Sequence, residues 1–325
     1  MFNEFSVLKK ILGKIDETNR NHPALIVPPG DDAALLASLT RPVISTDTQR
    51  EGVHFRLDWQ TPFEIGYKSV VVALSDLAAS YARPVCLFIN LGLPKTVNEI
   101  LIEELYDGVK SALLHNSCAL GGGNISASTE LSLDLFALGE GDASLFPMRS
   151  KALAGEGLYT TGPLGLARAG LMCLEQNCRD YPDLVGHFKK PVARFDAAKV
   201  LCDFNVACVM DLSDGLAGDA GHMALASDIT LRVHIENEHI YSSLEKFCST
   251  FDLSPAEMMI SGGEDYELLF SCAPDLFEKI RKHLPQAFRV GSCLPFTGVR
   301  LEGVPATCRS FVHGNNQGKT NDETV

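Results

Sequence analysis

Residues 27–55 read VPPGDDAALLASLTRPVISTDTQREGVHF, a stretch that sets four carboxylates and a histidine around two short apolar runs. Asp31 and Asp32 follow a glycine, and Asp47 follows an apolar pair that would deliver it from a buried strand to the edge of a sheet. Neighbouring carboxylates repel one another unless a cation lies between them, and their oxygens suit Mg²⁺, which commonly bridges carboxylates to substrate phosphates. Taken alone, the stretch is better explained as a solvated turn rich in aspartate, so its meaning depends on the rest of the chain.

Size and charge limit the classes to which the protein can belong. The chain has 325 residues, which favours two domains of roughly 150 residues each. Hydrophobic residues make up 46% of the chain and charged residues 21%, enough apolar surface for two cores. The formal charge of −13 argues against a nucleic-acid or membrane partner, because both are themselves negative. An anionic substrate would therefore be held by metal ions, helix N-termini or single basic side chains.

The ten cysteines are scattered, with no Cys-x-x-Cys pair, and most stand among apolar residues. We interpret them as reduced thiols that pack as small hydrophobes. The first ten residues include an acid and no long apolar run, which predicts neither a signal peptide nor a membrane anchor. We therefore expect a cytoplasmic protein. Residues 313–325 carry little that could be buried and are expected to form a disordered tail.

Helical and strand patterns alternate through the first half of the chain. Apolar spacing predicts a short amphipathic helix over 5–15, and Thr61 followed by Pro62 predicts the start of another helix. The remaining patterns predict a helix over 62–82, a strand over 85–93, a helix over 97–115, a glycine-rich turn over 118–126 and a strand over 131–139. The first domain should thus contain helices interleaved with about four strands.

One acid interrupts the almost wholly apolar helix predicted over 62–82. A carboxylate in such surroundings is costly unless it is paired or bound to a metal, so Asp76 is a functional candidate. The structural alternative is a salt bridge to Lys68, two turns earlier on roughly the same face.

The second half opens with a strand that enters a glycine turn, together over 157–165, and a helix over 166–174, a generic topology for cradling phosphate. Its spacing matches neither the dinucleotide-binding nor the Walker motif. A second apolar run leads into Asp211 and Asp214, and the tripeptide Leu-Ser-Asp stands at both 74–76 and 212–214. This repetition suggests two related halves that face each other.

The stretch over 258–270 sets Glu264, Asp265 and Glu267 between two apolar runs. Three acids in so short a segment indicate a functional turn, with a solvated hairpin tip as the structural alternative.

Six of these motifs, taken in order, strongly resemble the thiamine-monophosphate kinase family. They are GDDAA at 30–34, STDT at 45–48, EGVHF at 51–55, LSDLAA at 74–79, DLSDGL at 211–216 and SGGEDYE at 261–267. The resemblance runs over residues 5–312. It implies an α/β (α+β) two-domain PurM-like fold, with an N-terminal mixed sheet that pairs into a dimer barrel and a C-terminal α/β domain that completes the cleft. The domains would span 1–148 and 149–312.

The resemblance also implies ATP-dependent phosphorylation of thiamine monophosphate to thiamine diphosphate, with Mg²⁺ as cofactor and ATP as co-substrate in a homodimer. It implies metal ligands at Asp32, Ser45, Thr46, Asp47, Asp76, Asn124, Asp211 and Asp214. It implies ATP contacts from Gly123, Asn124, Arg149 and Ser213, and thiamine monophosphate contacts from His54, Glu264 and Phe311. No general base is assigned, because the attacking phosphate oxygen is already anionic.

Three positions depart from the family pattern. Asn124 stands where an aspartate is frequent, residues 166–167 are Leu-Ala where Asp-Ser is usual, and the closing aromatic motif is represented only around Phe311.

Two other interpretations of the function stay open at this point. One is another ATP-using member of the superfamily, such as an aminoimidazole ribonucleotide or selenophosphate synthetase, although residues 1–30 contain no cysteine. The other is a nucleotide-binding regulator without catalysis, which would require broken metal sites.

Overall fold

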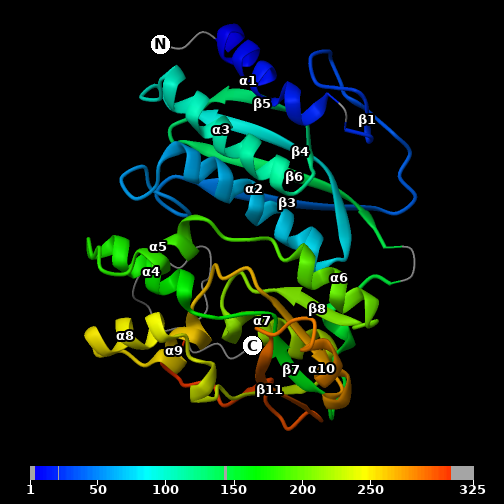
Figure 1. Ribbon diagram of the computed structural model, residues 1–325, viewed down its shortest axis with the longest axis vertical. Coiled ribbons are helices and arrows are strands. Elements are labelled where there is room, and N and C mark those ends of the chain that lie inside the picture. Colours follow the sequence, from blue (N-terminus) through cyan, green and yellow to red (C-terminus); the bar gives the residue numbers. More distant parts are fainter. Residues whose placement is uncertain (1–3, 21, 143–144, 309–325) are drawn as a thin grey trace.

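The computed structural model describes residues 4–20, 22–142 and 145–308, which form two α/β parts stacked along the long axis of the molecule (Figure 1). We call them the N-terminal and C-terminal domains. Phe311 and the tail over 313–325 lie outside the described residues, so the expectations for them stay predictions.

The N-terminal domain is built on a four-stranded sheet in the order β3-β6-β4-β5. The strands are β3 (Pro42–Arg50), β4 (Ala82–Leu93), β5 (Ala119–Ala127) and β6 (Ser132–Gly141). β6 pairs antiparallel with both β3 and β4, while β5 runs parallel to β4. The strands predicted over 85–93 and 131–139 are therefore present, the first beginning three residues earlier and the second shifted to Ser132–Gly141.

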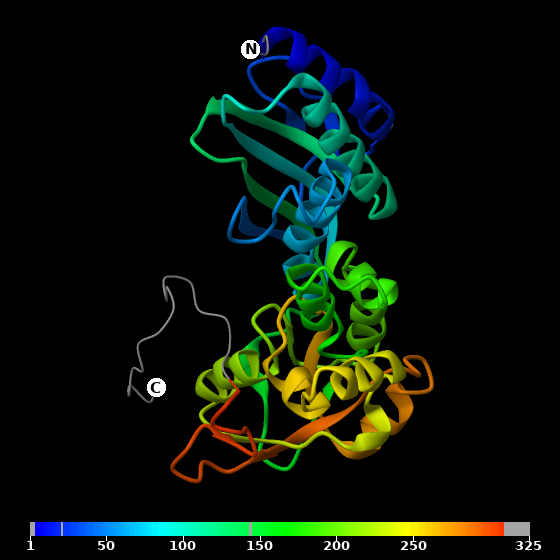
Figure 2. The same cartoon turned by 90° about the vertical axis from the view of Figure 1, so that its left-hand side faces the viewer.

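Helices gather on one side of this sheet, as Figure 2 shows. α2 (Pro62–Ala79) and α3 (Glu99–His115) share a core with the sheet, and α1 (Glu4–Asn19) packs on α3. On the opposite face, the short strands β1 (Leu25–Val27) and β2 (Leu35–Leu36) cover only part of the sheet. Much of that second face stays exposed.

The start of α2 follows from its sequence. Thr61 accepts a hydrogen bond from the Glu64 backbone N–H, and the Glu64 carboxylate accepts one from the Thr61 N–H. Pro62 occupies the first helical position, where its missing N–H costs nothing. The predicted N-cap is thus confirmed, and the helix ends at Ala79 rather than at residue 82.

The glycine-rich turn predicted over 118–126 is wrong, because these residues form strand β5. The ring of Phe88 lies over Gly121, and a side chain at Gly123 would collide with the Ile89 carbonyl of β4. Gly122 adopts φ +148° where the pairing of β5 with β4 shifts register. The glycines allow two strands to pack closely around a bulge.

The C-terminal domain contains a six-stranded sheet in the order β12-β9-β11-β7-β10-β8. Its strands are β7 (Gly157–Thr160), β8 (Cys208–Asp211), β9 (Thr230–Val233), β10 (Leu268–Cys272), β11 (Phe288–Leu294) and β12 (Leu301–Glu302). Neighbouring strands are antiparallel except β12 and β9.

Helices cover both faces of this second sheet. One face packs against α4 (Leu166–Glu175), α7 (Leu216–Ser227), α8 (Ser242–Thr250) and α9 (Pro255–Ser261), and the other against α6 (Phe195–Asp203) and α10 (Pro274–Ile280). α5 (Pro182–Lys189) packs on α4, and two 3-10 turns span Arg149–Lys151 (η1) and Asn237–His239 (η2). Ala78 and Ala79 at the end of α2 join the core beneath α6, so this helix contributes to both domains.

Two findings bear on the earlier expectations. All ten cysteines are free thiols, and seven of them are buried. Among the described residues, no helix combines the length and the apolar character that crossing a membrane would require.

Candidate active site

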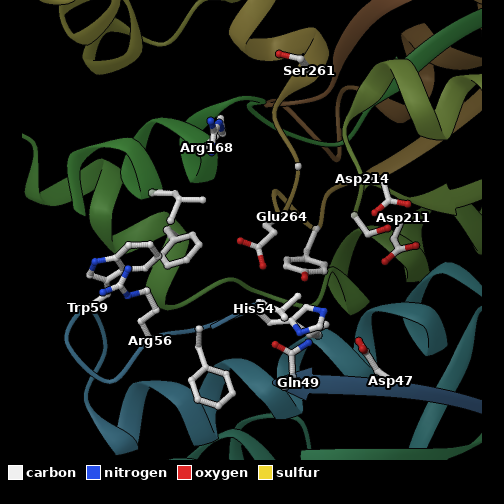
Figure 3. Close-up of a pocket in the computed structure, with 18 of the residues that line it drawn as sticks. Asp47, Gln49, His54, Arg56, Trp59, Arg168, Asp211, Asp214, Ser261 and Glu264 are labelled. Carbon is white, nitrogen blue, oxygen red and sulfur yellow. The ribbon is translucent and has the colours of Figure 1, made fainter. Parts of the chain in front are cut away.

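A cavity of about 950 Å³ lies between the two domains and is lined by residues of both. Figure 3 shows Asp47, Asp211 and Asp214 at one end of it and Arg56 and Trp59 at the other. We call the first group, together with Asp76, the acidic end, and the pair Arg56 and Trp59 the aromatic end. His54 and Glu264 lie between the two ends (Figure 3).

Hydroxyl groups hold two carboxylates of the acidic end in place. The Ser45 hydroxyl on β3 donates a hydrogen bond to Asp76 on α2. The Ser75 hydroxyl, also on α2, donates to Asp211 at 2.8 Å across the domain boundary. The two acids thus approach each other from different domains, as the repeated Leu-Ser-Asp tripeptide suggested.

Burial and mutual repulsion raise the pKa values of two carboxyl groups at the acidic end, Asp47 and Asp211. Burial raises the pKa of Asp47 to about 6, and Asp76 and Glu264 add to the effect. Burial together with the Asp76 charge raises the pKa of Asp211 to about 7. Acids held this close together favour cation binding, because an ion between them relieves the repulsion. Among the described residues that line the cavity, the arginines Arg56 and Arg168 lie away from the acidic end (Figure 3).

Asp47 reaches the cavity in a way the sequence did not predict. β3 continues to Arg50, so Asp47 lies inside an edge strand and not at a strand end. Alternation along the strand turns Ser45 and Asp47 toward α2 and leaves Thr46 exposed on the opposite face.

Several predicted site residues do not line the cavity, and their roles stay predictions. Asp32 is exposed between β1 and β2, and Thr46 points to the far face of the sheet. Gly123 and Asn124 lie on β5, at the edge of the sheet opposite β3. Arg149 in η1 is exposed, although its charge slightly offsets the rise in the pKa of Asp211. Asp47, His54, Asp76, Asp211, Ser213, Asp214 and Glu264 do line the cavity.

The middle of the cavity presents one histidine in a defined orientation. His54 Nδ1 accepts a hydrogen bond from the Arg50 backbone N–H at 3.1 Å. The neutral ring therefore carries its proton on Nε2. At the aromatic end, the Arg56 guanidinium lies 4.5 Å from the centre of the Trp59 ring and pairs with Asp58 at 2.7 Å, so the two planar groups form a flat wall.

The turn around Glu264 is neither a hairpin tip nor a solvated loop. Residues 262–267 connect α9 to β10, and the Glu264 N–H donates to the Ser213 carbonyl at 2.8 Å. Lys68 forms its ion pair with Glu264, at 3.1 Å. The alternative in which Lys68 pairs with Asp76 is therefore wrong.

The backbone N–H groups at the glycine turn that opens α4 are paired with a side chain of the protein itself. The Asp265 carboxylate accepts hydrogen bonds from the Gly165 N–H at 2.6 Å and the Ala167 N–H at 3.2 Å. The Asp265 carboxylate thus occupies the anion-binding position at the N-terminus of α4. Leu166 and Ala167 are buried, which agrees with the absence of the Asp-Ser pair that is usual in the family at these positions.

The sequence reasoning missed several residues of the site. Asp219 on α7 is 2% exposed and accepts a hydrogen bond from the Asp214 N–H at 3.2 Å. An acid in an apolar helix was the signal that identified Asp76, and the same signal could have identified Asp219. Trp59, the only tryptophan of the chain, and Tyr266 line the cavity itself, but an isolated aromatic residue carries no local signal.

Comparison with known proteins fits this arrangement. The models for AIR synthase related protein match at residues 30–140 for the N-terminal domain and 154–295 for the C-terminal domain. The thiamine-monophosphate kinase of Aquifex aeolicus (strain VF5) is 34% identical over 247 residues, which cover 74% of this chain and 79% of that protein. The chain belongs to the thiamine-monophosphate kinase family. The thiamine-monophosphate kinase of Bacillus subtilis (strain 168) is 30% identical over 82% of this chain and 85% of its own length.

Solved structures of thiamine-monophosphate kinases share the fold. The enzyme from Stenotrophomonas maltophilia K279a is 29% identical with a TM-score of 0.81, over 91% of this chain and 97% of that one. AaThiL complexed with AMPPCP and TMP is 28% identical with a TM-score of 0.76, over 95% and 96% of the two chains. Escherichia coli HypE, a hydrogenase maturation protein, shares the fold at 16% identity. The predicted two-domain PurM-like fold is confirmed, and the protein is a kinase.

Proposed function

We propose that this protein transfers a phosphoryl group from ATP to thiamine monophosphate, giving thiamine diphosphate and ADP. The observation that carries the proposal is the division of the interdomain cavity into an acidic end and an aromatic end. The acidic end suits the phosphate groups of two reactants, which cations would bridge to its carboxylates. The aromatic end suits an organic ring system. The names of the relatives, and the AMPPCP and TMP bound to AaThiL, support the same pairing of reactants.

Mg²⁺ fits the acidic end on chemical grounds. Asp47, Asp76, Asp211 and Asp214 offer only hard oxygen donors, and the raised pKa values of Asp47 and Asp211 show that burial and crowding disfavour their ionised forms without a cation. When bound, Mg²⁺ would neutralise phosphate charge and align the two reactants. Asp32, Ser45, Thr46 and Asn124 stay proposed ligands by resemblance, as do Gly123, Arg149 and Ser213 for ATP.

The reaction needs alignment more than a side-chain base. The acceptor is a phosphate oxygen that already carries negative charge, so it can attack the terminal phosphorus of ATP directly, opposite the leaving ADP. His54 and Glu264 lie between the two ends of the cavity and would hold thiamine monophosphate at that point. Phe311 stays a proposed third contact.

We propose a homodimer formed through the open face of the N-terminal sheet. Ile44 on β3 is 70% exposed and Phe136 on β6 is 41% exposed, on the face opposite α2. Large exposed apolar side chains on a sheet face commonly mark an interface. Thr46 lies between them on the same face, and a partner copy would bury it.

The ten free cysteines suit the cytoplasm, which we propose as the location.

A coupled ADP-release assay tests the proposal. The purified protein would receive MgATP with thiamine monophosphate, thiamine or an aminoimidazole ribonucleotide precursor, and the products would be separated by chromatography. We expect ADP and thiamine diphosphate in equal amounts with thiamine monophosphate alone. Turnover with the aminoimidazole precursor would assign the chain to another ATP-using branch of the superfamily. MgATP binding without turnover on any acceptor would favour the non-catalytic regulator.

A further inference from the structure

Lys68 on α2 lies directly behind the cavity. Its side chain is 2% exposed, and its Nζ lies 3.1 Å from Glu264 Oε1 and 3.6 Å from the centre of the Phe188 ring. Glu264 and Phe188 both line the cavity and belong to the C-terminal domain, whereas α2 belongs to the N-terminal domain. Lys68 therefore contacts the back of the cavity wall from across the domain boundary.

The burial of the Lys68 ammonium group is energetically unfavourable by itself. Its removal from water costs several kcal/mol unless a partner compensates it. Beyond the ion pair with Glu264 and the ring face of Phe188, Lys68 Nζ has no hydrogen-bonding partner among the described residues. Burial lowers the pKa of Lys68, while the Glu264 charge opposes that change. An apolar side chain of equal length would fill the same space without this cost, so packing alone does not explain a lysine.

The turn that carries Glu264 also requires support. Glu264 and Tyr266 adopt φ angles of +66° and +51°, which are unfavourable for residues with a side chain. The Glu264 N–H donates to the Ser213 carbonyl, and the Tyr266 N–H donates to the Leu212 carbonyl at 2.9 Å. These bonds fix the backbone of the turn, and the ion pair with Lys68 fixes the direction of the Glu264 carboxylate.

We propose that Lys68 is a positioning residue, which holds the Glu264 carboxylate in the orientation that receives the organic part of the substrate. The inference rests on the proposed function, in which Glu264 contacts thiamine monophosphate. Glu264 Oε1 is engaged by Lys68, which leaves Oε2 to accept from an amino group or to face a cationic ring. A carboxylate oriented before binding loses less side-chain entropy on contact.

Steady-state kinetics of Lys68→Met, Glu264→Gln and the double variant test this role. We expect Lys68→Met to raise KM for thiamine monophosphate by about tenfold or more, because the Glu264 carboxylate would no longer be held in the orientation that receives the substrate. KM for ATP should stay within about twofold. The double variant should be no worse than Glu264→Gln alone, because Lys68 acts through Glu264.

Lys189→Met is the matched control. Lys189 on α5 forms an ion pair with Glu64 on α2 at 3.0 Å, so it also joins the two domains, but it does not touch Glu264. Its loss should lower the melting temperature and leave KM for thiamine monophosphate unchanged. The positioning role would be overturned if Lys68→Met raised KM for thiamine monophosphate and KM for ATP equally. It would also be overturned if the effects of the two substitutions on KM for thiamine monophosphate added in the double variant.

Hydrogen exchange of residues 262–268 separates this inference from the proposed function. If the wild-type protein does not turn over thiamine monophosphate, the proposed function fails, and exchange still reports on the turn. Faster exchange in folded Lys68→Met supports the role of Lys68, and unchanged exchange overturns it. If Lys68→Met does not fold, Glu264→Gln and the double variant, which leaves no unpaired charge, are compared instead. Equal exchange in these two supports the inference, and faster exchange in the double variant contradicts it.

Discussion

The Ser75 hydroxyl and the Asp211 carboxylate meet at 2.8 Å, which joins α2 of the N-terminal domain to β8 of the C-terminal domain. Ser75 is fully buried and Asp211 is 8% exposed. Each stands in or next to a Leu-Ser-Asp tripeptide, so the two copies of the motif meet at the boundary between the domains. The acidic end of the cavity is thereby assembled from both domains, and the Ser75 hydroxyl links them.

Ser75→Ala should destabilise the protein by about 1–3 kcal/mol, because it leaves a buried carboxylate without its donor. Thermal or urea unfolding of the metal-free protein measures this loss. Ser69→Ala is the control, since the Ser69 hydroxyl is equally buried but donates to the Ile65 carbonyl of its own helix at 2.7 Å. Equal losses in the two variants would mean that the contact between the domains adds nothing.

Asp47→Asn should abolish most activity and leave the fold intact. The amide removes one charge from a crowded group of acids, so the melting temperature without metal should hold or rise slightly. With MgATP, a loss of ~3 kcal/mol in transition-state stabilisation would slow turnover by about two orders of magnitude. Asp107→Asn, which alters an exposed acid on α3, should change neither quantity. Near-normal turnover of Asp47→Asn would remove this residue from the site.

The sequence predicted those parts of the fold and site whose signals are local. Helix α2 could be identified from its capping residues, and Asp76 because a carboxylate in the apolar part of a helix is costly unless it is paired or bound to a metal. β5 was misjudged because glycines can serve a turn or a close approach of strands, and only the position of β4 decides between them. The partner of Lys68 could not be predicted, because Glu264 lies in another domain and no local pattern encodes that pairing.

Ile44→Lys should convert the proposed dimer into a monomer. A charge on the open sheet face would have to be buried on association, which is unfavourable without a partner. Sedimentation at micromolar concentration measures the change. Ile100→Lys is the control, because Ile100 is 74% exposed on α3 and lies away from that face. A monomeric wild-type protein would contradict the expected assembly.

The stability of the protein should depend on the ionisation of Asp265. Burial raises its pKa from the ordinary 3.8 to about 7. The folded state therefore binds this proton more tightly than the unfolded state, so stability falls as pH rises from about 4 to about 7 and then levels off. In Asp265→Asn this contribution is absent, and the melting temperature should fall less over that range. Asp275→Asn, an exposed acid on α10, should follow the wild-type curve, and parallel curves for all three proteins would refute the assignment.

No cysteine should take part in the reaction. Burial raises the pKa of Cys86 and Cys208 to about 11 and of Cys272 to about 12, so few thiolates form near pH 8. Of the ten thiols, seven are buried, which leaves three that could react in the native protein. Thiol titration should find at most three reactive groups before unfolding and ten after it. Loss of turnover on alkylation of folded protein would reverse this conclusion.

Helix α2 contributes Leu74 and Leu77 to the core of the N-terminal domain and Ala78 and Ala79 to a core of the C-terminal domain. A rotation of one domain away from the other would therefore have to pull a continuous helix out of a packed interior. Reactants would then enter and products leave through movement of loops that line the cavity, such as residues 51–60. The pace of each catalytic cycle would then depend on how quickly short loops rearrange, with the two domains acting as a fixed frame.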